Sequence, residues 1–133
     1  MHILLPKISA MDELTVDRII SVHDTLLAGT SDDARLLSEP NLHQLAFLVN
    51  LEPDPGKKAT LVLFSLCAYP AFRDGNKRTA TALAGEILRE SGYNLDPADP
   101  ELIRILAGIT DFTIEPEDIE KWLLDHASWK ERK

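Results

Sequence analysis

The chain has 133 residues, of which 44% are hydrophobic, so it is long enough for one domain with a core and too short for two ordinary ones. A net charge of −8 argues against direct binding of nucleic acid, which needs clustered Lys and Arg. No apolar stretch approaches the roughly 20 residues of a membrane span. The single cysteine, Cys67, excludes an internal disulfide, and a free thiol favours a cytoplasmic location.

The N-terminal third predicts a short arm followed by helices. Residues 1–10 are expected to form an extended arm. A helix is expected from about Met11, with apolar residues at helical spacing and Gly29 near its end. We expect a short helical piece over Ala34–Ser38, and Pro40 is expected in the first turn of the next helix. We therefore expect two helices here, separated by a turn region.

The middle of the chain contains its most apolar segment. Residues 57–69 are compatible with a buried strand or a central helix, and their length and the helical periods on both sides favour the helix. The break at residues 53–56 precedes this segment, and Pro70 ends it. A second amphipathic helix follows the loop after Pro70 and runs to about Ser91, where Gly92 terminates it.

Two shorter helices are predicted near the C-terminus, around residues 101–108 and after Pro116. Strand signals are poor throughout, because no alternating apolar run is bounded by hairpin turns. The expected fold class is all-α, with a single domain over residues 1–133.

The loop between the two central helices carries most of the chemistry. Asp74 and Gly75 are turn-forming residues, and Asn76 can cap the helix that begins there. The free N–H groups of a helix start, with Lys77 and Arg78 beside them, form an anion site. Cations in the first turn oppose the helix dipole, which favours a functional reason for them. The loop is therefore predicted to hold a phosphate and its metal ion.

This loop resembles the signature of the Fic/Doc family, whose pattern runs His-x-Phe-x-Asp/Glu-Gly/Ala-Asn-Gly/Lys-Arg. The lysine and the small size of the chain point to the death-on-curing (Doc) branch. Weaker similarity extends over most of the domain. The resemblance implies a compact fold of about six to seven helices around a central one. The matching residues are Phe72, Asp74, Gly75, Asn76, Lys77 and Arg78.

The resemblance also implies roles for these residues. Asp74 would hold a Mg²⁺ ion that bridges the phosphates of a nucleotide such as ATP, although it could instead only shape the turn. Gly75 and Asn76 would supply backbone donors to phosphate. Lys77 and Arg78 would bind phosphate oxygens. Phe72 is expected to be a packing anchor of the loop.

The pattern's histidine falls on Pro70, which cannot accept a proton. In the family that histidine would be the general base, a role worth roughly 10²–10⁴-fold in rate. The chain has four other histidines, and their spacing gives no reason to choose a substitute. Among them, His23 lies on the apolar face of the first helix and is expected to be a core residue.

We therefore expect a Doc-like toxin component of a toxin–antitoxin system that binds a nucleotide but is weak or inactive as a transferase. The resemblance implies an antitoxin chain as partner and a protein of translation as target. The alternative is a non-catalytic interaction domain that binds an antitoxin-like partner in a groove beside the loop.

Overall fold

The computed structural model describes residues 13–126 and 128–129. The predicted N-terminal arm, residues 1–10, lies outside them. The described residues form six helices and one pair of two-residue strands, as the all-α prediction expects. The helices are α2 (Val16–Leu27), α3 (Glu39–Leu51), α4 (Pro55–Ala68), α5 (Asn76–Glu90), α6 (Pro100–Thr110) and α7 (Pro116–His126).

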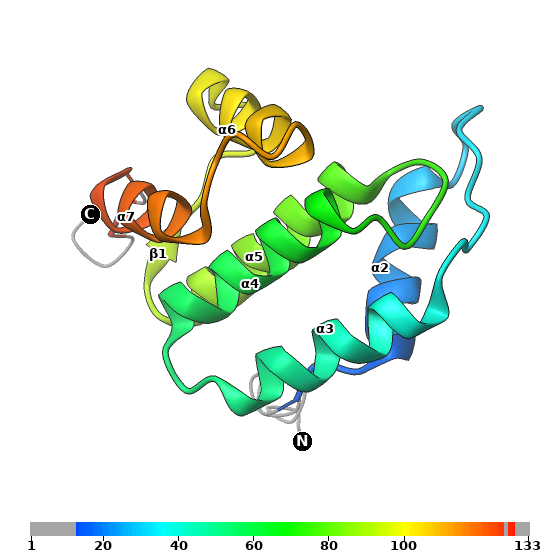
Figure 1. Cartoon of the computed structure of the whole chain (residues 1–133), viewed down its shortest axis with the longest axis horizontal. Coiled ribbons are helices and arrows are strands. Elements are labelled where there is room, and N and C mark those ends of the chain that lie inside the picture. Colours follow the sequence, from blue (N-terminus) through cyan, green and yellow to red (C-terminus); the bar gives the residue numbers. More distant parts are fainter. Residues whose placement is uncertain (1–12, 127, 130–133) are drawn as a thin grey trace.

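Helix α4 is the centre of the fold, which confirms the helical interpretation of its apolar sequence. It packs against α3, α5, α6 and α7 (Figure 1). Asp54 caps its start by accepting a hydrogen bond from the Lys57 N–H, and Pro55 occupies its first turn. Eight residues of α4 are buried, so the helix has no solvent-facing stripe of the usual width.

The core is one continuous cluster to which every helix contributes. Helix α5 lies beside α4, and α2 packs on α5 at the other side (Figure 1). The most completely buried side chains include Ile19 of α2, Leu42 of α3 and Leu63 of α4. This packing fixes the angle at which α4 and α5 meet the loop that joins them.

Helix ends agree with the sequence prediction in most places. Ser38 caps α3, Pro40 lies in its first turn, and α5 ends just before Gly92, whose φ is +90°. Helix α2, the first helix of the described residues, begins at Val16, later than predicted, because the Thr15 side chain accepts the Arg18 N–H and caps it there.

The only strands among the described residues are β1 (Tyr93–Asn94) and β2 (Ser128–Trp129), which pair antiparallel. Tyr93 lies opposite Trp129, and Asn94 lies opposite Ser128. This pair ties the end of the chain to the segment after α5. It lies at the end of α5 that is far from the loop, because the loop precedes the start of that helix.

Candidate functional site

The loop between α4 and α5 makes its tight turn at Gly75. Tyr69 is the C-cap of α4, Pro70 follows it, and Gly75 is the N-cap of α5 with φ +88°. A Cβ atom at Gly75 would lie 2.5 Å from the Leu27 Cδ1 and 3.2 Å from the His23 ring. Both the backbone conformation and the close approach of α2 therefore require glycine.

The Asn76 side chain holds the preceding part of the loop. Its Oδ1 accepts hydrogen bonds from the N–H groups of Ala71 (3.2 Å) and Phe72 (3.1 Å), and its Nδ2 donates to the Phe72 carbonyl (2.8 Å). The prediction that Asn76 caps α5 is wrong, because Asn76 is the first helical residue and its side chain points back to the loop. Its amide fixes the shape of the backbone.

The floor of the loop comes from α2. The His23 ring is fully buried and stacks on the Phe72 ring, with centroids 3.6 Å apart and planes at 8°. Its Nε2–H donates to the Asp74 carbonyl over 2.7 Å. The predictions of a core histidine and of Phe72 as a packing anchor are confirmed. The contacts of His23 with this loop were not predicted, since 51 residues separate His23 from Asp74.

A second segment runs alongside the loop. Leu36 forms an antiparallel bridge with Phe72, and the N–H groups of Leu37 and Ser38 both donate to the Ala71 carbonyl. The Arg73 N–H donates in return to the Arg35 carbonyl (2.8 Å). The predicted helical piece over Ala34–Ser38 is therefore wrong. Its backbone groups bond to the loop, which requires an extended conformation.

The same segment engages two charged residues of the loop. The Asp74 Oδ2 accepts the Asp33 N–H over 2.8 Å, and the Arg78 guanidinium pairs with the Asp32 carboxylate at 2.5 Å. The two side chains of this ion pair are 47% and 40% exposed, so the pair is screened by solvent and contributes little stability. The exposed side chains of Arg73 and Lys77 form no ion pair within the described residues.

The start of α5 presents three backbone donors. Gly75 provides no side-chain cap, and the first helical hydrogen bond runs from the Thr79 N–H to the Gly75 carbonyl (2.9 Å). The N–H groups of Asn76, Lys77 and Arg78 thus have no hydrogen-bond partner among the described residues. Such groups, together with the helix dipole, favour an anion at this point.

These donors open onto a surface pocket of about 560 Å³. Every site residue predicted from the sequence lines it, and so does Pro70. The other lining residues were not predicted from the sequence, and they come from three further parts of the chain or lie between motif positions. The added residues are Leu37, Cys67, Arg73 and Thr110.

The thiol of Cys67 lies at the wall of this pocket and is almost completely buried. Burial raises the pKa of Cys67 to about 11, and the positive charge of Lys77 opposes this effect. The thiol is therefore protonated at neutral pH and is a poor nucleophile.

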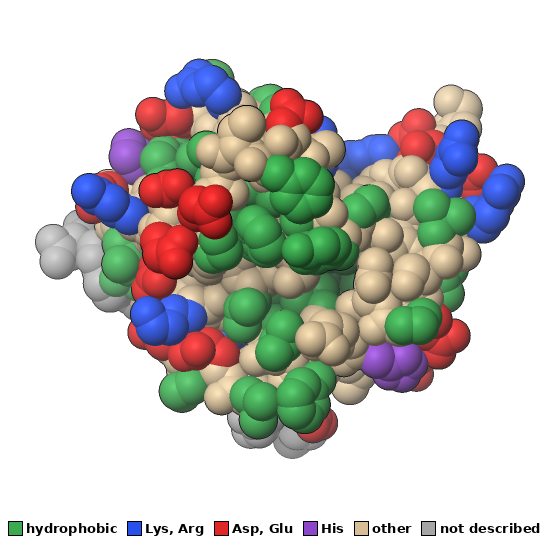
Figure 2. Space-filling view, in the orientation of Figure 1, with side chains coloured by type: hydrophobic (Ala, Val, Ile, Leu, Met, Phe, Trp, Pro, Cys, Tyr) green, Lys and Arg blue, Asp and Glu red, His purple; other side chains and the backbone are tan. Residues whose placement is uncertain are grey.

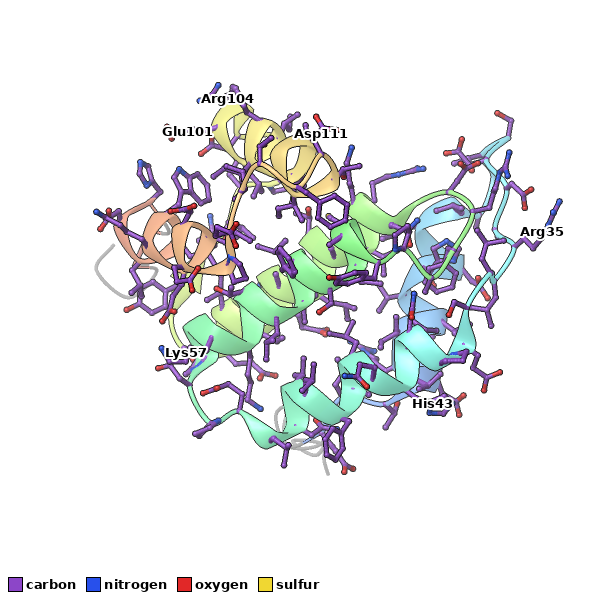
Figure 3. All side chains as sticks on the ribbon, viewed as in Figure 1. Arg35, His43, Lys57, Glu101, Arg104 and Asp111 are labelled. Carbon is purple, nitrogen blue, oxygen red and sulfur yellow. The ribbon has the colours of Figure 1, made fainter. Side chains whose placement is uncertain are left out.

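No histidine of the described residues lines the pocket. His23 lies beneath the loop with its Nε2 bonded to Asp74. His43 pairs with Glu39 on α3 (Figure 3), and His126 bonds to the Trp122 carbonyl on α7. The pocket thus combines anion-binding groups with no basic imidazole in the described part of the chain.

Comparison with known families agrees with this geometry. The model of the Fic/DOC family matches residues 13–88, which is more than half of the chain. The chain belongs to the Fic/DOC family. The match takes in α2 to α5, the loop and the segment that pairs with it, and it gives this Fic/DOC domain the fold of Fic-type transferases. No curated protein sequence matched the chain.

Two further properties of this Fic/DOC domain bear on its ligands. Within residues 13–126 and 128–129, no three His, Cys, Asp or Glu side chains are grouped so that they could hold a metal ion by themselves. No helix of that part is both long and apolar enough to cross a membrane.

Proposed function

We propose that this domain binds the phosphates of a nucleoside triphosphate at the start of α5 and transfers them weakly or not at all. The observation that carries the proposal is that three N–H groups without a partner among the described residues, together with Lys77 and Arg78, converge on one pocket. Pro70, at the position of the motif histidine, lines the same pocket. Preorganised donors and cations stabilise phosphate charge without any proton transfer.

Asp74 suits the Mg²⁺ ion that the family resemblance implies. One carboxylate oxygen accepts the Asp33 N–H, and the other makes no hydrogen bond within the described residues. Magnesium needs only one or two carboxylates when phosphate oxygens and water complete its shell, which fits the lack of a protein-only cluster. When bound, the ion would neutralise phosphate charge.

The slow step of the transfer would be activation of the hydroxyl that accepts the phosphoryl or nucleotidyl group. A protein hydroxyl that attacks phosphorus must lose its proton, and Pro70 offers no acceptor for it. Without a base the rate falls by roughly 10²–10⁴-fold, while binding and orientation can persist. We therefore propose a domain that binds nucleotide well and turns it over slowly. Its biological setting would be that of a cytoplasmic Doc-like toxin, with an antitoxin partner and a target in translation.

Calorimetry with ATP and Mg²⁺ tests the binding. We expect saturable binding that Asp74→Ala combined with Arg78→Ala abolishes. The matched control combines Asp125→Ala with Arg104→Ala, which removes the same charges from exposed sites on α7 and α6. Binding that is absent from the native chain, or lost equally in both double variants, would refute the phosphate site.

Restoring the base tests the second half of the proposal. Pro70→His should give transfer of label from γ-³²P or α-³²P ATP to protein in a bacterial lysate, and the native chain should give little. Pro70→Ala is the control, since it also relieves the proline ring but supplies no imidazole. Strong transfer by the native chain would contradict the proposed weak activity.

A second candidate function is the non-catalytic interaction domain. Several large apolar side chains are more than half exposed, among them Phe47 and Leu51 of α3 and Leu124 of α7. Figure 2 shows hydrophobic side chains gathered in the middle of one face, between α3 and α6. Two results together would favour this function. The native chain would bind no ATP, and it would bind a partner protein that the double variant Phe47→Glu with Leu51→Glu no longer binds.

A further inference from the structure

An exposed pair of aromatic rings lies beside the candidate phosphate site. The rings of Tyr69 and Phe112 are 56% and 61% exposed, and their centroids are 6.3 Å apart with planes at 59°. The Phe64 ring also meets Tyr69 edge-on, with centroids 6.2 Å apart. Tyr69 is the C-cap of α4 and Phe112 follows the end of α6, so two well-packed helices hold the pair.

Phe112 occupies a backbone position that favours glycine. Its φ is +60°, and within the described residues it is the only non-glycine residue with positive φ. The Phe112 N–H donates to Ile109, and the Thr113 N–H donates to the Gly108 carbonyl, so the α6 end is held by a turn of the Schellman kind. A phenylalanine here costs stability and gains little burial in return. Its ring is therefore explained better by an external contact than by the fold.

Each ring of the aromatic pair is close in sequence to a residue that lines the pocket. Tyr69 directly precedes Pro70, and Phe112 lies two residues after Thr110; both Pro70 and Thr110 line the pocket. Figure 3 shows Asp111, the residue before Phe112, at the end of α6 nearer to the loop. The pocket is thus lined by cations and N–H donors, and two of its lining residues, Pro70 and Thr110, adjoin the segments that carry the aromatic rings.

We propose that Tyr69 and Phe112 form a stacking platform for the base of a nucleotide whose phosphates lie at the start of α5. The proposal rests on the proposed phosphate site and assigns the other half of the ligand. A volume of about 560 Å³ falls within the range of small-molecule sites. Stacking uses the π-face that every base has, so the platform should accept ATP and UTP with similar affinity.

The test measures the affinities of ATP, tripolyphosphate and adenosine, each with Mg²⁺, by calorimetry. We expect ATP to bind roughly 10-fold to 100-fold more tightly than tripolyphosphate, and Tyr69→Ala or Phe112→Gly to remove most of that difference. Neither substitution should change the affinity for tripolyphosphate. Phe112→Gly should also raise the melting temperature, because glycine adopts φ +60° without strain. A weakened ATP site in that variant would therefore not reflect misfolding.

The matched control is Phe47→Ala, which removes a ring of equal exposure, 61%, from α3. It should leave all three affinities unchanged.

If tripolyphosphate binds as tightly as ATP, or if Tyr69→Ala and Phe112→Gly leave the ATP affinity intact, the platform is refuted and the phosphate site stands. If adenosine binds in a Tyr69-dependent way but tripolyphosphate does not bind, the platform stands and the phosphate site is refuted. If no ligand binds, both are refuted.

Discussion

Several side chains in and beneath the loop act by holding its backbone in place. The Asn76 amide makes three hydrogen bonds to Ala71 and Phe72, and His23 supports Asp74 from below. These contacts hold the N–H groups and the cations in place before any ligand arrives. Preorganisation of this kind removes part of the ordering cost of binding.

Gly75→Ala is expected to be the most damaging small substitution in the loop. The new Cβ would lie 2.5 Å from Leu27, and alanine at φ +88° is strained. We expect a loss of roughly 2–4 kcal/mol in the free energy of unfolding, measured by urea titration. Gly29→Ala is the control, because Gly29 also has positive φ but no atom within 4 Å of the new Cβ. Equal losses in the two variants would show that the contact with α2 is unimportant.

The buried thiol predicts how stability changes at high pH. The folded-state pKa of Cys67 is about 11, above the ordinary value of 9.0, so the unfolded chain loses this proton first as pH rises. The free energy of unfolding therefore falls between about pH 9 and 11, by up to about 1.4 kcal/mol for each unit of pKa difference. Cys67→Ala should lose less stability than the native chain over this range. Parallel pH profiles of unfolding would contradict the prediction.

At the scale of elements, the segment between α2 and α3 and the loop after α4 behave as one unit. Asp33 to Ser38 exchanges backbone hydrogen bonds with Ala71 to Asp74, and each segment would otherwise expose these groups. The shape of the phosphate site therefore depends on a segment about 40 residues earlier in the chain.

Leu37→Pro tests this dependence. It removes the N–H that donates to the Ala71 carbonyl over 2.6 Å, and we expect a loss of roughly 1–3 kcal/mol in local stability. Hydrogen exchange of the Arg73 and Asp74 amides, measured by NMR, should become faster. Ala34→Pro is the control, because the Ala34 N–H has no partner among the described residues. Unchanged exchange in the Leu37 variant would mean that the loop holds its shape alone.

For the whole molecule, the family match ends at residue 88 but the core does not. Five buried side chains of α6 and α7 belong to the same cluster as α4: Leu102, Leu106, Ile109, Ile119 and Leu123. At about 1.5–3 kcal/mol each, their burial contributes roughly 7–15 kcal/mol. That amount equals the total stability of a typical domain, about 5–15 kcal/mol.

A chain that ends after Gly92 should therefore not fold cooperatively. Circular dichroism during thermal unfolding should show no sigmoidal transition, whereas the full chain should show one. A chain that ends after His126 is the control, since it keeps α6 and α7 and, of the described elements, loses the β2 strand. A cooperative transition in the shorter chain would show that α2 to α5 form an independent unit.

The sequence predicted most of the helices, because helices follow from local patterns. The 3.6-residue period identified α4 and α5, and Asp74 to Arg78 are consecutive, so one turn brings them together. The sequence did not predict contacts between distant segments, such as His23 with Phe72 or Leu36 with Phe72. The predicted helical piece over Ala34–Ser38 was wrong for the same reason, since its conformation is decided by pairing with a distant segment, as in the bridge of Leu36 to Phe72, 36 residues away.

The conformation of the rest of the loop does not depend on Pro70. No hydrogen bond within the described residues uses Pro70, and Asn76, Gly75 and His23 hold the neighbouring backbone. A different side chain at this position would therefore meet a site already built around it. A proline codon can become a histidine codon through one base substitution. Where residue 70 is encoded by CCU or CCC, one base substitution separates this gene from one that encodes the complete signature loop.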